Sequence, residues 1–310
     1  MSDSPTLSPS SPAAAAAGPD LTARLLLVLL TFAWGLTWPA MRIALTEVPP
    51  VSLRVAAAFL AGLSLTVVAL VRRQSLYVPF GRQWLHLFVA SFFNVTAFGL
   101  LSAFAQLSAA TSRVTILAYT MPIWAALLGW FVLGERLTAI RALAQALCIA
   151  GVVVLVAPLW DAGVPLGLVL ALLSGVSWAV ATVYVKWADM KIAPIVSAVW
   201  QFAGALVVTL AVVPVVEGGL HVWPSRWLVL GAVIWTGLIG GGLAYYLWFN
   251  IVGRISASTA SLGVLSVPLV GVAGSALILG ERPTLYDLSG FVLIFLAAAC
   301  VLFAPARRVG

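Results

Sequence analysis

The sequence predicts an all-α integral membrane protein with ten transmembrane helices, arranged as two inverted five-helix repeats with both termini cytoplasmic. Three observations lead to this fold class: the composition, the number of apolar segments, and an internal repeat. Of the 310 residues, 63% are hydrophobic and only 8% are charged. Because an average soluble domain is about one-quarter charged, this chain has too few polar side chains to cover a water-facing surface.

Ten apolar segments are each long enough to cross a bilayer core, which takes about 20 helical residues. The connections between them are short, so successive helices are expected to be antiparallel neighbours. The expected helices cover residues 24–46, 51–71, 84–106, 111–133, 138–157, 164–187, 193–216, 226–250, 255–279 and 284–304. Residues 1–22, rich in Ser, Pro and Ala, are expected to form a disordered tail, and residues 306–310 a short C-terminal tail.

The distribution of basic residues sets the expected orientation. If the N-terminus is cytoplasmic, eleven of the sixteen Lys and Arg residues fall on the inside and five on the outside. The positive-inside rule therefore places both termini in the cytoplasm, which an even number of spans allows. The formal charge of +7 is spread singly along the chain rather than in a basic stripe, so nucleic acid is not an expected partner.

A sequence repeat divides the chain into residues 23–160 and 161–305. Leu133-Gly134-Glu135-Arg136 recurs as Leu279-Gly280-Glu281-Arg282, and in both copies a proline precedes the glutamate by 13 residues. That proline is Pro122 in the first copy and Pro268 in the second. Two further pairs match: the Ser-Ala-x-Thr sequences that begin at Ser108 and Ser256, and Trp34 with Trp178, each followed eight residues later by a cation, Arg42 or Lys186. Each copy contains five helices, an odd number, so the second must enter the membrane from the opposite side. Inverted repeats of this kind can open a central site to one side and then to the other.

These motifs resemble those of the drug/metabolite transporter superfamily and, among its branches, the ten-helix EamA-type family. The resemblance rests on the paired Leu-Gly-Glu turns, the Ser-Ala-x-Thr starts of the fourth and ninth helices and the five-plus-five plan, and it covers residues 22–305. It implies a central cavity lined by helices 1, 3, 4, 6, 8 and 9, with helices 5 and 10 to the side. Within the superfamily, the branch that exports amino acids, aromatic ones included, is nearest in character.

Prolines, aromatic residues and polar groups within the spans are the candidates for the cavity wall. Pro122 and Pro268 fall near the middle of their helices, where a proline frees backbone carbonyls that a wet cavity can satisfy; the alternative is a kink that serves packing alone. Asn94 either lines the cavity or forms a helix–helix hydrogen bond, and the deep tryptophans either line it or pack in the core. The full set of candidates is Trp34, Trp38, Asn94, Phe98, Tyr119, Pro122, Trp178, Tyr184, Tyr245, Tyr246 and Pro268.

Charged residues are absent from the centre of every expected span. Five basic residues lie near span ends, where long side chains reach the interface at little cost: Arg42, Arg54, Arg113, Lys186 and Arg254. A neutral cavity with aromatic walls favours neutral or zwitterionic solutes, and the lack of an intramembrane acid favours a facilitator driven by the solute gradient. The candidates for a gating or structural role are Arg42 and Lys186, at the expected cavity rims, and the turn residues Glu135 and Glu281, which precede helices 5 and 10 and suit their N-terminal dipoles.

The sequence contains no motif for catalysis or metal binding. Cys148 and Cys300 are isolated in apolar runs and are expected to be small buried hydrophobes, and neither a cofactor nor a metal is expected. His86 and His221 are far apart and unassisted, which argues against an integral-membrane enzyme acting on lipid-linked substrates.

The sequence therefore predicts a secondary transporter in the plasma (bacterial inner) membrane. We expect it to export small neutral or zwitterionic metabolites, most of all aromatic or hydrophobic amino acids, by alternating access through the central cavity. The alternative within this class is a broad-specificity exporter of apolar drugs. The expected partners are a small-molecule substrate and the lipid bilayer; the sequence does not fix the oligomeric state, and a monomer is consistent with it.

Overall fold

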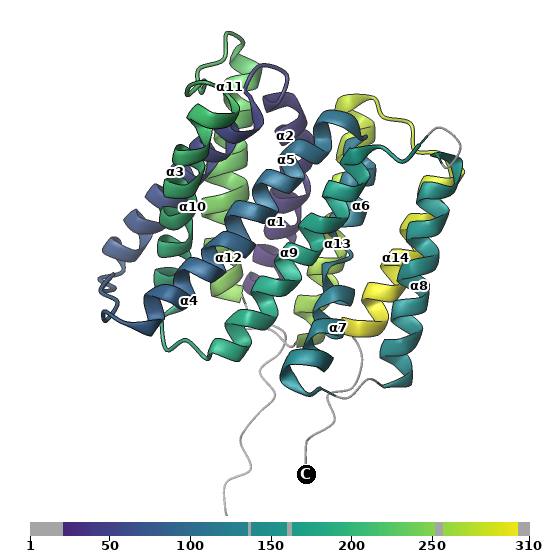
Figure 1. The fold of residues 1–310 in the computed structure, drawn as a ribbon, viewed down its shortest axis with the longest axis horizontal. Helices are drawn as coiled ribbons and strands as arrows, with labels where there is room; N and C mark the ends of the chain where they lie inside the picture. The colour runs from purple at the N-terminus through teal and green to yellow at the C-terminus, as the bar shows by residue number, and fades with distance from the viewer. Residues whose placement is uncertain (1–20, 136–137, 160–162, 252–256, 303–310) are drawn as a thin grey trace, which may run out of the picture.

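The computed structural model describes residues 21–135, 138–159, 163–251 and 257–302, with the backbone alone at 257–263 and 301–302. Within these ranges every regular element is a helix (Figure 1). Eight helical segments are long and apolar enough to cross a membrane, and two shorter apolar helices, Val264–Leu279 and Leu285–Cys300, complete a set of ten. The predicted all-α membrane fold is confirmed, and each predicted span overlaps one of these segments.

Six spans are continuous helices: α3 (Pro50–Val71), α8 (Ala139–Val156) with the short 3-10 turn η2 (Ala157–Leu159), α9 (Leu166–Ala188), α10 (Pro194–Val216), α13 (Ala257–Leu279) and α14 (Leu285–Leu302). The other four are interrupted. They are span 1, made of α1 (Leu21–Gly35) and α2 (Thr37–Ala44); span 3, made of α4 (Arg82–Ser91), η1 (Phe92–Ala97) and α5 (Phe98–Ser108); span 4, made of α6 (Thr111–Ala118) and α7 (Met121–Leu133); and span 8, made of α11 (Trp227–Ile234), η3 (Trp235–Leu243) and α12 (Ala244–Ile251).

The interruptions have identifiable local causes. Span 4 breaks ahead of Pro122, which has no N–H, so the carbonyl of Ala118 loses its helical partner. Spans 3 and 8 instead widen into the π-helical turns η1 and η3. Gly241 and Gly242 lie in η3 and bring it close to α3, since a Cβ at Gly241 would lie 2.6 Å from the Cβ of Ala61. Wide turns of this kind occur frequently at functional sites.

The helices form a bundle with one pair set to the side. α8 and α14 pack against each other at the right of Figure 1. Gly151 and Gly290 bring these two helices together, since a Cβ at either would lie 2.9 Å from the other's carbonyl oxygen. α9 contacts α5, α6 and α7, and α3 packs on α10. Spans 5 and 10 therefore lie to the side, as the resemblance implies.

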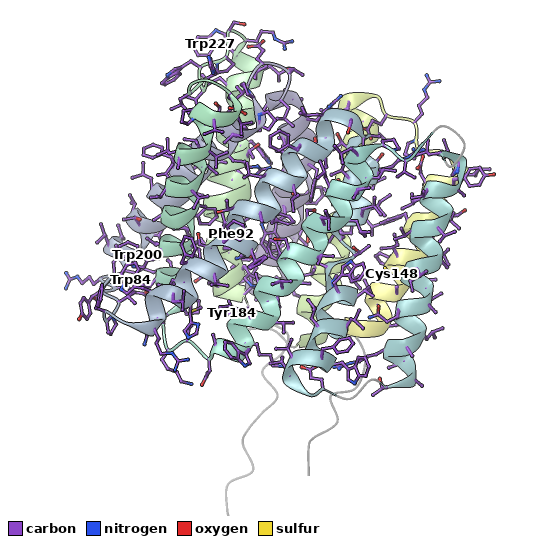
Figure 2. All side chains as sticks on the ribbon, in the orientation of Figure 1. Trp84, Phe92, Cys148, Tyr184, Trp200 and Trp227 are labelled. Atoms are coloured by element: carbon purple, nitrogen blue, oxygen red, sulfur yellow. The ribbon has the colours of Figure 1, made fainter. Side chains whose placement is uncertain are left out.

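The bundle has two ends, which we call the terminal face and the opposite face. The terminal face, below in Figure 1, is where α1 begins and α14 ends, and the opposite face, above, is where α2 ends and α11 begins. Between the faces the outer surface is apolar, because side chains such as Leu25, Phe32 and Val153 are half or more exposed. Trp227 lies at the opposite face (Figure 2) and is 85% exposed, a position typical of an aromatic belt at a membrane interface.

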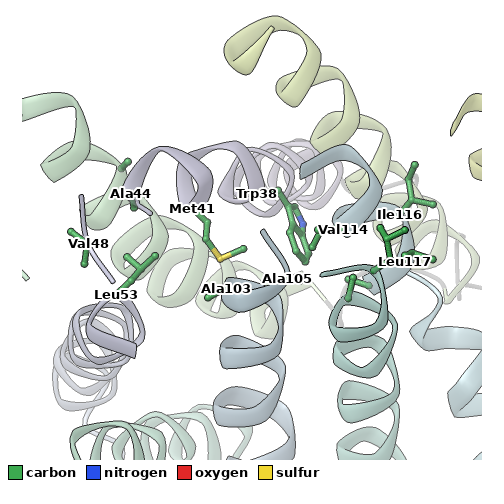
Figure 3. Close-up of a cluster of buried hydrophobic side chains, with 14 of the residues drawn as sticks. Trp38, Met41, Ala44, Val48, Leu53, Ala103, Ala105, Val114, Ile116 and Leu117 are labelled. Atoms are coloured by element: carbon green, nitrogen blue, oxygen red, sulfur yellow. The ribbon is translucent and has the colours of Figure 1, made fainter. Parts of the chain in front are cut away.

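Buried apolar clusters hold the spans together. The main cluster joins spans 1–6, 8 and 10 and includes Trp38, Met41, Val114 and Leu117 (Figure 3). A smaller cluster lies beneath α8 and α14, and it contains both cysteines: Cys148 is buried in it and Cys300 packs against it. Both thiols are free, and they occupy the apolar positions expected for small hydrophobic residues.

Candidate functional site: a central cavity

A cavity of about 140 Å³ lies in the middle of the bundle, between spans 1–4 and 6–9. A single water needs roughly 10–15 Å³ measured in this way, so the cavity has room for a small organic solute. Its wall is mostly apolar. The lining side chains with a polar group are Trp34, Thr37, Trp38, Arg54, Asn94, Thr96, Ser102, Tyr119, Trp178, Thr209, Thr236 and Tyr245.

Aromatic rings form two groups on the wall. In the first, Phe98 lies between Trp38 and Trp178, with ring centroids 6.4 and 4.9 Å away. In the second, Tyr245 contacts both Trp34, at 6.2 Å, and Phe202, at 5.2 Å. All four pairs meet edge to face, the arrangement that aromatic quadrupoles favour. The cavity is therefore built to cover a flat or bulky apolar group.

The wide turn of span 3 is anchored to its neighbours by hydrogen bonds. Asn94 lines the cavity and donates from Nδ2 to Oε1 of Gln201 on α10, at 2.8 Å. On the other side, Ser177 of α9 donates to the carbonyl of Phe93, at 2.7 Å. A π-helical turn leaves backbone groups unpaired, and the hydrogen bond from Ser177 satisfies one of them, while the bond between Asn94 and Gln201 joins two side chains. Asn94 therefore both lines the cavity and forms a hydrogen bond between helices, the two alternatives that the sequence left open.

Seven of the eleven predicted wall residues line this cavity: Trp34, Trp38, Asn94, Phe98, Tyr119, Trp178 and Tyr245. The other four lie elsewhere, for reasons of helix geometry. Pro122 and Pro268 face each other across a separate apolar crevice of about 10 Å³ between spans 4, 9 and 10. Because one residue turns a helix by about 100°, Tyr246 points away from the cavity that Tyr245 lines, and its hydroxyl accepts a hydrogen bond from Arg72, at 2.7 Å. Tyr184 lies 2.7 Å from Nδ1 of His86.

Spans 2 and 7 also contribute to the wall, which neither the resemblance nor the repeat implies. On α3 the lining residues are Arg54, Ala57 and Ala58, and on α10 they are Phe202, Ala205 and Thr209. Both sets follow the i, i+3, i+4 or i, i+3, i+7 spacing of one helix face. The signal was therefore present in the sequence, but it cannot be told from an ordinary packing face without knowing what lies opposite.

The prediction that the side chain of Arg54 extends to the membrane surface is wrong. Its side chain is half-buried, lines the cavity and runs along α5, where a Cβ at Gly99 would lie 3.1 Å from Cδ of Arg54. The guanidinium donates from Nη2 to the sulfur of Met41, while Nε is buried without a hydrogen-bond partner. The physical reason is that the first turn of α3 is already buried, with Val51 at 0% exposure, so Arg54 lies a turn inside the protein.

A glutamate that directly follows α10 caps that first turn. The carboxylate of Glu217 accepts hydrogen bonds from the backbone N–H groups of Val51, at 2.6 Å, and Ser52, at 2.9 Å. Beside it, Glu47 accepts from the backbone of Ser225 and pairs with Arg226. The hydrogen bond from Arg226 holds the pKa of Glu47 down to about 2. Spans 1, 2, 7 and 8 are thus tied together at the opposite face.

The four gating candidates lie outside the cavity. Arg42 donates to the carbonyl of Gln106 at the end of α5. Lys186 pairs with Glu135 at 2.7 Å, and that hydrogen bond, together with one from Arg141, lowers the pKa of the Glu135 carboxyl. Glu281 accepts from two backbone N–H groups at the start of α6.

The sequence predicts that Glu135 and Glu281 each cap the helix that follows. In the structure neither of them does. The N-terminus of α8 is capped by Thr138, whose hydroxyl accepts from the backbone of Arg141 at 3.4 Å. At α14 the cap is Thr284, whose hydroxyl accepts from the backbone N–H of Asp287 at 3.2 Å, while the Asp287 carboxylate accepts in return from the backbone N–H of Thr284 at 2.8 Å. With these two N-termini already satisfied, the carboxylates of Glu135 and Glu281 are available to other helices.

Comparison with known proteins gives the family. The model of the EamA-like transporter family matches residues 21–157 and again 165–303. The chain is 27% identical to the uncharacterized transporter YvbV of Bacillus subtilis over 284 residues, covering 89% of this chain and 90% of that one. It is 29% identical over 299 residues to a probable amino-acid metabolite efflux pump of Salmonella typhimurium, covering 87% and 91%.

A solved structure supports the fold. It is titled only as the crystal structure of a protein, is 22% identical, and superposes with a TM-score of 0.61 over 90% of this chain and 96% of its own. The chain belongs to the EamA-like transporter family. It is a multi-pass membrane transporter rather than an enzyme, as the sequence predicted.

Proposed function

We propose that this member of the EamA-like transporter family exports small zwitterionic metabolites, aromatic or hydrophobic amino acids above all, by alternating access through the central cavity. The observation that carries the proposal is the cavity itself, an aromatic-walled space of about 140 Å³ enclosed by eight of the ten spans. Two curated relatives, from Salmonella typhimurium and Escherichia coli, are named probable amino-acid metabolite efflux pumps, which supports the same substrate class.

The wall suits an apolar side chain with a small polar end. Burial of one aromatic side chain contributes about 1.5–3 kcal/mol, and edge-to-face contacts with rings such as Phe98 and Trp178 add roughly 0.5–1.5 kcal/mol. Polar groups for the backbone part of an amino acid come from Asn94, Tyr119 and Tyr245. The same cavity offers little to a large, strongly hydrated solute.

Interrupted helices support the alternating-access part of the proposal. Four of the eight spans around the cavity contain a break or a wide turn in mid-membrane, at span 1, η1, span 4 and η3, and discontinuous helices mark the binding region of many secondary transporters. The family model matches the chain twice, in residues 21–157 and 165–303, as expected for two inverted repeats. Among the described lining residues none is Asp or Glu, which favours a facilitator over a proton-coupled carrier.

Uptake of labelled phenylalanine into liposomes that contain the purified protein tests the proposal. We expect saturable flux that does not depend on an imposed pH gradient. Trp178→Ala, which removes a ring from the wall, should lower the flux at least about tenfold, because the lost contact area corresponds to more than about 1.4 kcal/mol. Trp227→Ala, on an exposed tryptophan at the opposite face, is the matched control and should change nothing. Absence of saturable amino-acid flux would contradict the substrate class.

Export of apolar drugs is the second candidate, because the wall is mostly apolar. It differs in what it requires of the solute. A drug exporter should carry bulky apolar cations or neutral molecules without a carboxylate, whereas an amino-acid exporter should reject them. Flux of a fluorescent cationic dye through the same liposomes distinguishes the two.

A further inference from the structure

We propose that Arg54 binds the carboxylate of the transported solute, so that the carboxylate is required for recognition and the ammonium group is dispensable. The inference rests on the proposed route through the central cavity and narrows its substrate class to monocarboxylates with an apolar body. Amino acids then qualify through their carboxylate, and the corresponding acids without an ammonium group qualify equally.

Arg54 differs from the other paired basic residues in the kind of atom that accepts its hydrogen bond. Among the described residues, carboxylates pair with Arg113, Arg141, Lys186, Lys191 and Arg226, and Arg42 donates to a backbone carbonyl. Arg54 has only the thioether of Met41, which is a weak acceptor. Its Nε is one of the few buried polar atoms in the described part of the chain that lack a partner.

The guanidinium of Arg54 therefore has no anionic partner among the described residues. Taking an unpaired cation out of water is costly, and ionisable groups inside a membrane protein almost always pair or face a functional cavity. Arg54 lines the cavity, and none of the other described lining residues carries a charge. A solute carboxylate could receive two parallel N–H groups from the planar fork, the strongest arrangement available to an ion pair.

The position of Arg54 orients the solute. Arg54 lies on the second turn of α3, which begins at the opposite face, whereas Tyr245 lies on α12, the last part of span 8, and its ring contacts Trp34. A solute whose carboxylate meets Arg54 therefore places its apolar body among the aromatic rings. Gly99 keeps this arrangement possible, since a side chain there would meet the guanidinium stem at 3.1 Å.

The described part of the cavity wall has no matching site for an ammonium group. None of its described lining residues is Asp or Glu, so the attractions it offers a cation are ring faces and neutral oxygens. With Arg54 as the one cation and no acid among the described lining residues, this wall complements a net negative charge better than a zwitterion. The inference revises the preference for neutral or zwitterionic solutes that the sequence suggested, because that preference assumed Arg54 to lie at the membrane surface.

Three probes with the same ring separate the two groups of an amino acid: phenylalanine, 3-phenylpropanoate and 2-phenylethylamine. Binding is measured through the tryptophan fluorescence of the purified protein, and transport by competition with labelled phenylalanine in liposomes. We expect 3-phenylpropanoate to bind as tightly as phenylalanine or more tightly. 2-Phenylethylamine should bind at least about tenfold more weakly, since it leaves the charged donors of Arg54 without an acceptor.

Substitutions at Arg54 tie the preference to this residue. Arg54→Gln should weaken binding of both carboxylates at least about tenfold, and Arg54→Lys, which keeps the charge but loses the fork, should recover part of it. Arg72→Gln is the matched control: Arg72 directly follows the last residue of the same helix and contacts Tyr246 and Asn250 outside the cavity, so the variant should bind all probes normally. Thermal unfolding in detergent shows that each variant is folded.

The outcomes distinguish this inference from the proposed function. If Arg54→Gln is folded and transports phenylalanine as the wild type does, the carboxylate assignment is overturned while amino-acid export stands. The same holds if the wild type binds 2-phenylethylamine as tightly as the two carboxylates. If the wild type binds none of the three probes, both the assignment and the proposed substrate class are wrong.

Discussion

Spans 4 and 9 carry the same sequence signals but use them differently. Each contains a proline and then, 13 residues later, the glutamate of a Leu-Gly-Glu turn. α7 ends at the terminal face and α13 at the opposite face (Figure 1). Glu281 accepts two backbone N–H groups, from Thr111 at 2.6 Å and Ser112 at 2.9 Å. Glu135 binds two side chains instead, those of Arg141 and Lys186.

This difference shows that the two ends of the molecule are held by unlike contacts. Backbone N–H groups at a helix start are fixed in place and carry the positive end of the helix dipole. Lysine and arginine side chains must be immobilised to pair, and water and salt screen them; Lys186 is 66% exposed. The contact of Glu281, at the opposite face, is therefore stronger than the contact of Glu135, although both glutamates belong to copies of the same Leu-Gly-Glu-Arg motif.

The largest expected effect comes from removing the Glu281 carboxylate. Glu281→Ala should destabilise the protein by about 1–2 kcal/mol, the usual value for loss of a helix cap. Glu281→Gln keeps one acceptor oxygen and should lose less. Thermal unfolding in detergent measures both, and a Glu281→Ala protein as stable as the wild type would show that the cap contributes nothing.

Replacing either of the two prolines should have an intermediate effect on the free energy of unfolding. The pair of variants is a second test of the difference between spans 4 and 9. Pro268 lies inside the continuous helix α13, whereas Pro122 lies in the first turn of α7, after the break. Proline is tolerated in a first turn but removes a hydrogen bond from a helix interior. Pro268→Ala should thus raise the free energy of unfolding by about 1 kcal/mol, and Pro122→Ala by less than about 0.5 kcal/mol. Equal effects in the two variants would argue against the difference between the spans.

The smallest effect belongs to Glu135, and it should depend on salt and pH. Because the folded pKa of Glu135 is lowered, its contribution is complete above its ordinary pKa of about 4.5 and is lost as the pH falls through the folded value. Glu135→Gln should cost less than about 1 kcal/mol at pH 7, and less again at pH 3 and in 1 M salt. Unfolding curves of wild type and variant under the three conditions test this, and a difference as large at pH 3 as at pH 7 would contradict it.

Hydropathy predicts the spans well because crossing a bilayer imposes the length and composition of each one. Seven of the eleven candidate residues line the cavity, because aromatic and amide side chains in mid-membrane rarely face lipid. Pro122 and Pro268 do not, since a proline marks where a helix breaks and not which way its ring points. The sequence also gives no sign of η1 and η3, which contain no proline; η3 approaches α3 closely through Gly241.

Arg54 is the most informative failure. Its distance from the end of an apolar run suggests a surface position, but Glu217 and the loop around it cover that end of α3. Whether an arginine near a span end is solvated therefore depends on contacts between residues about 165 apart in the chain. A sequence without aligned relatives does not reveal such contacts.

Protection of a cysteine in the cavity tests most directly whether solutes pass through it. Met121→Cys, on the wall, is introduced after Cys148 and Cys300 are replaced by serine, with Tyr77→Cys, on an exposed loop, as the control. If the cavity is the route, saturating 3-phenylpropanoate or phenylalanine should slow maleimide modification of Met121→Cys severalfold and leave Tyr77→Cys unchanged. If modification of Met121→Cys keeps its rate while transport of the same solute is saturated, the solute travels elsewhere and the account is wrong.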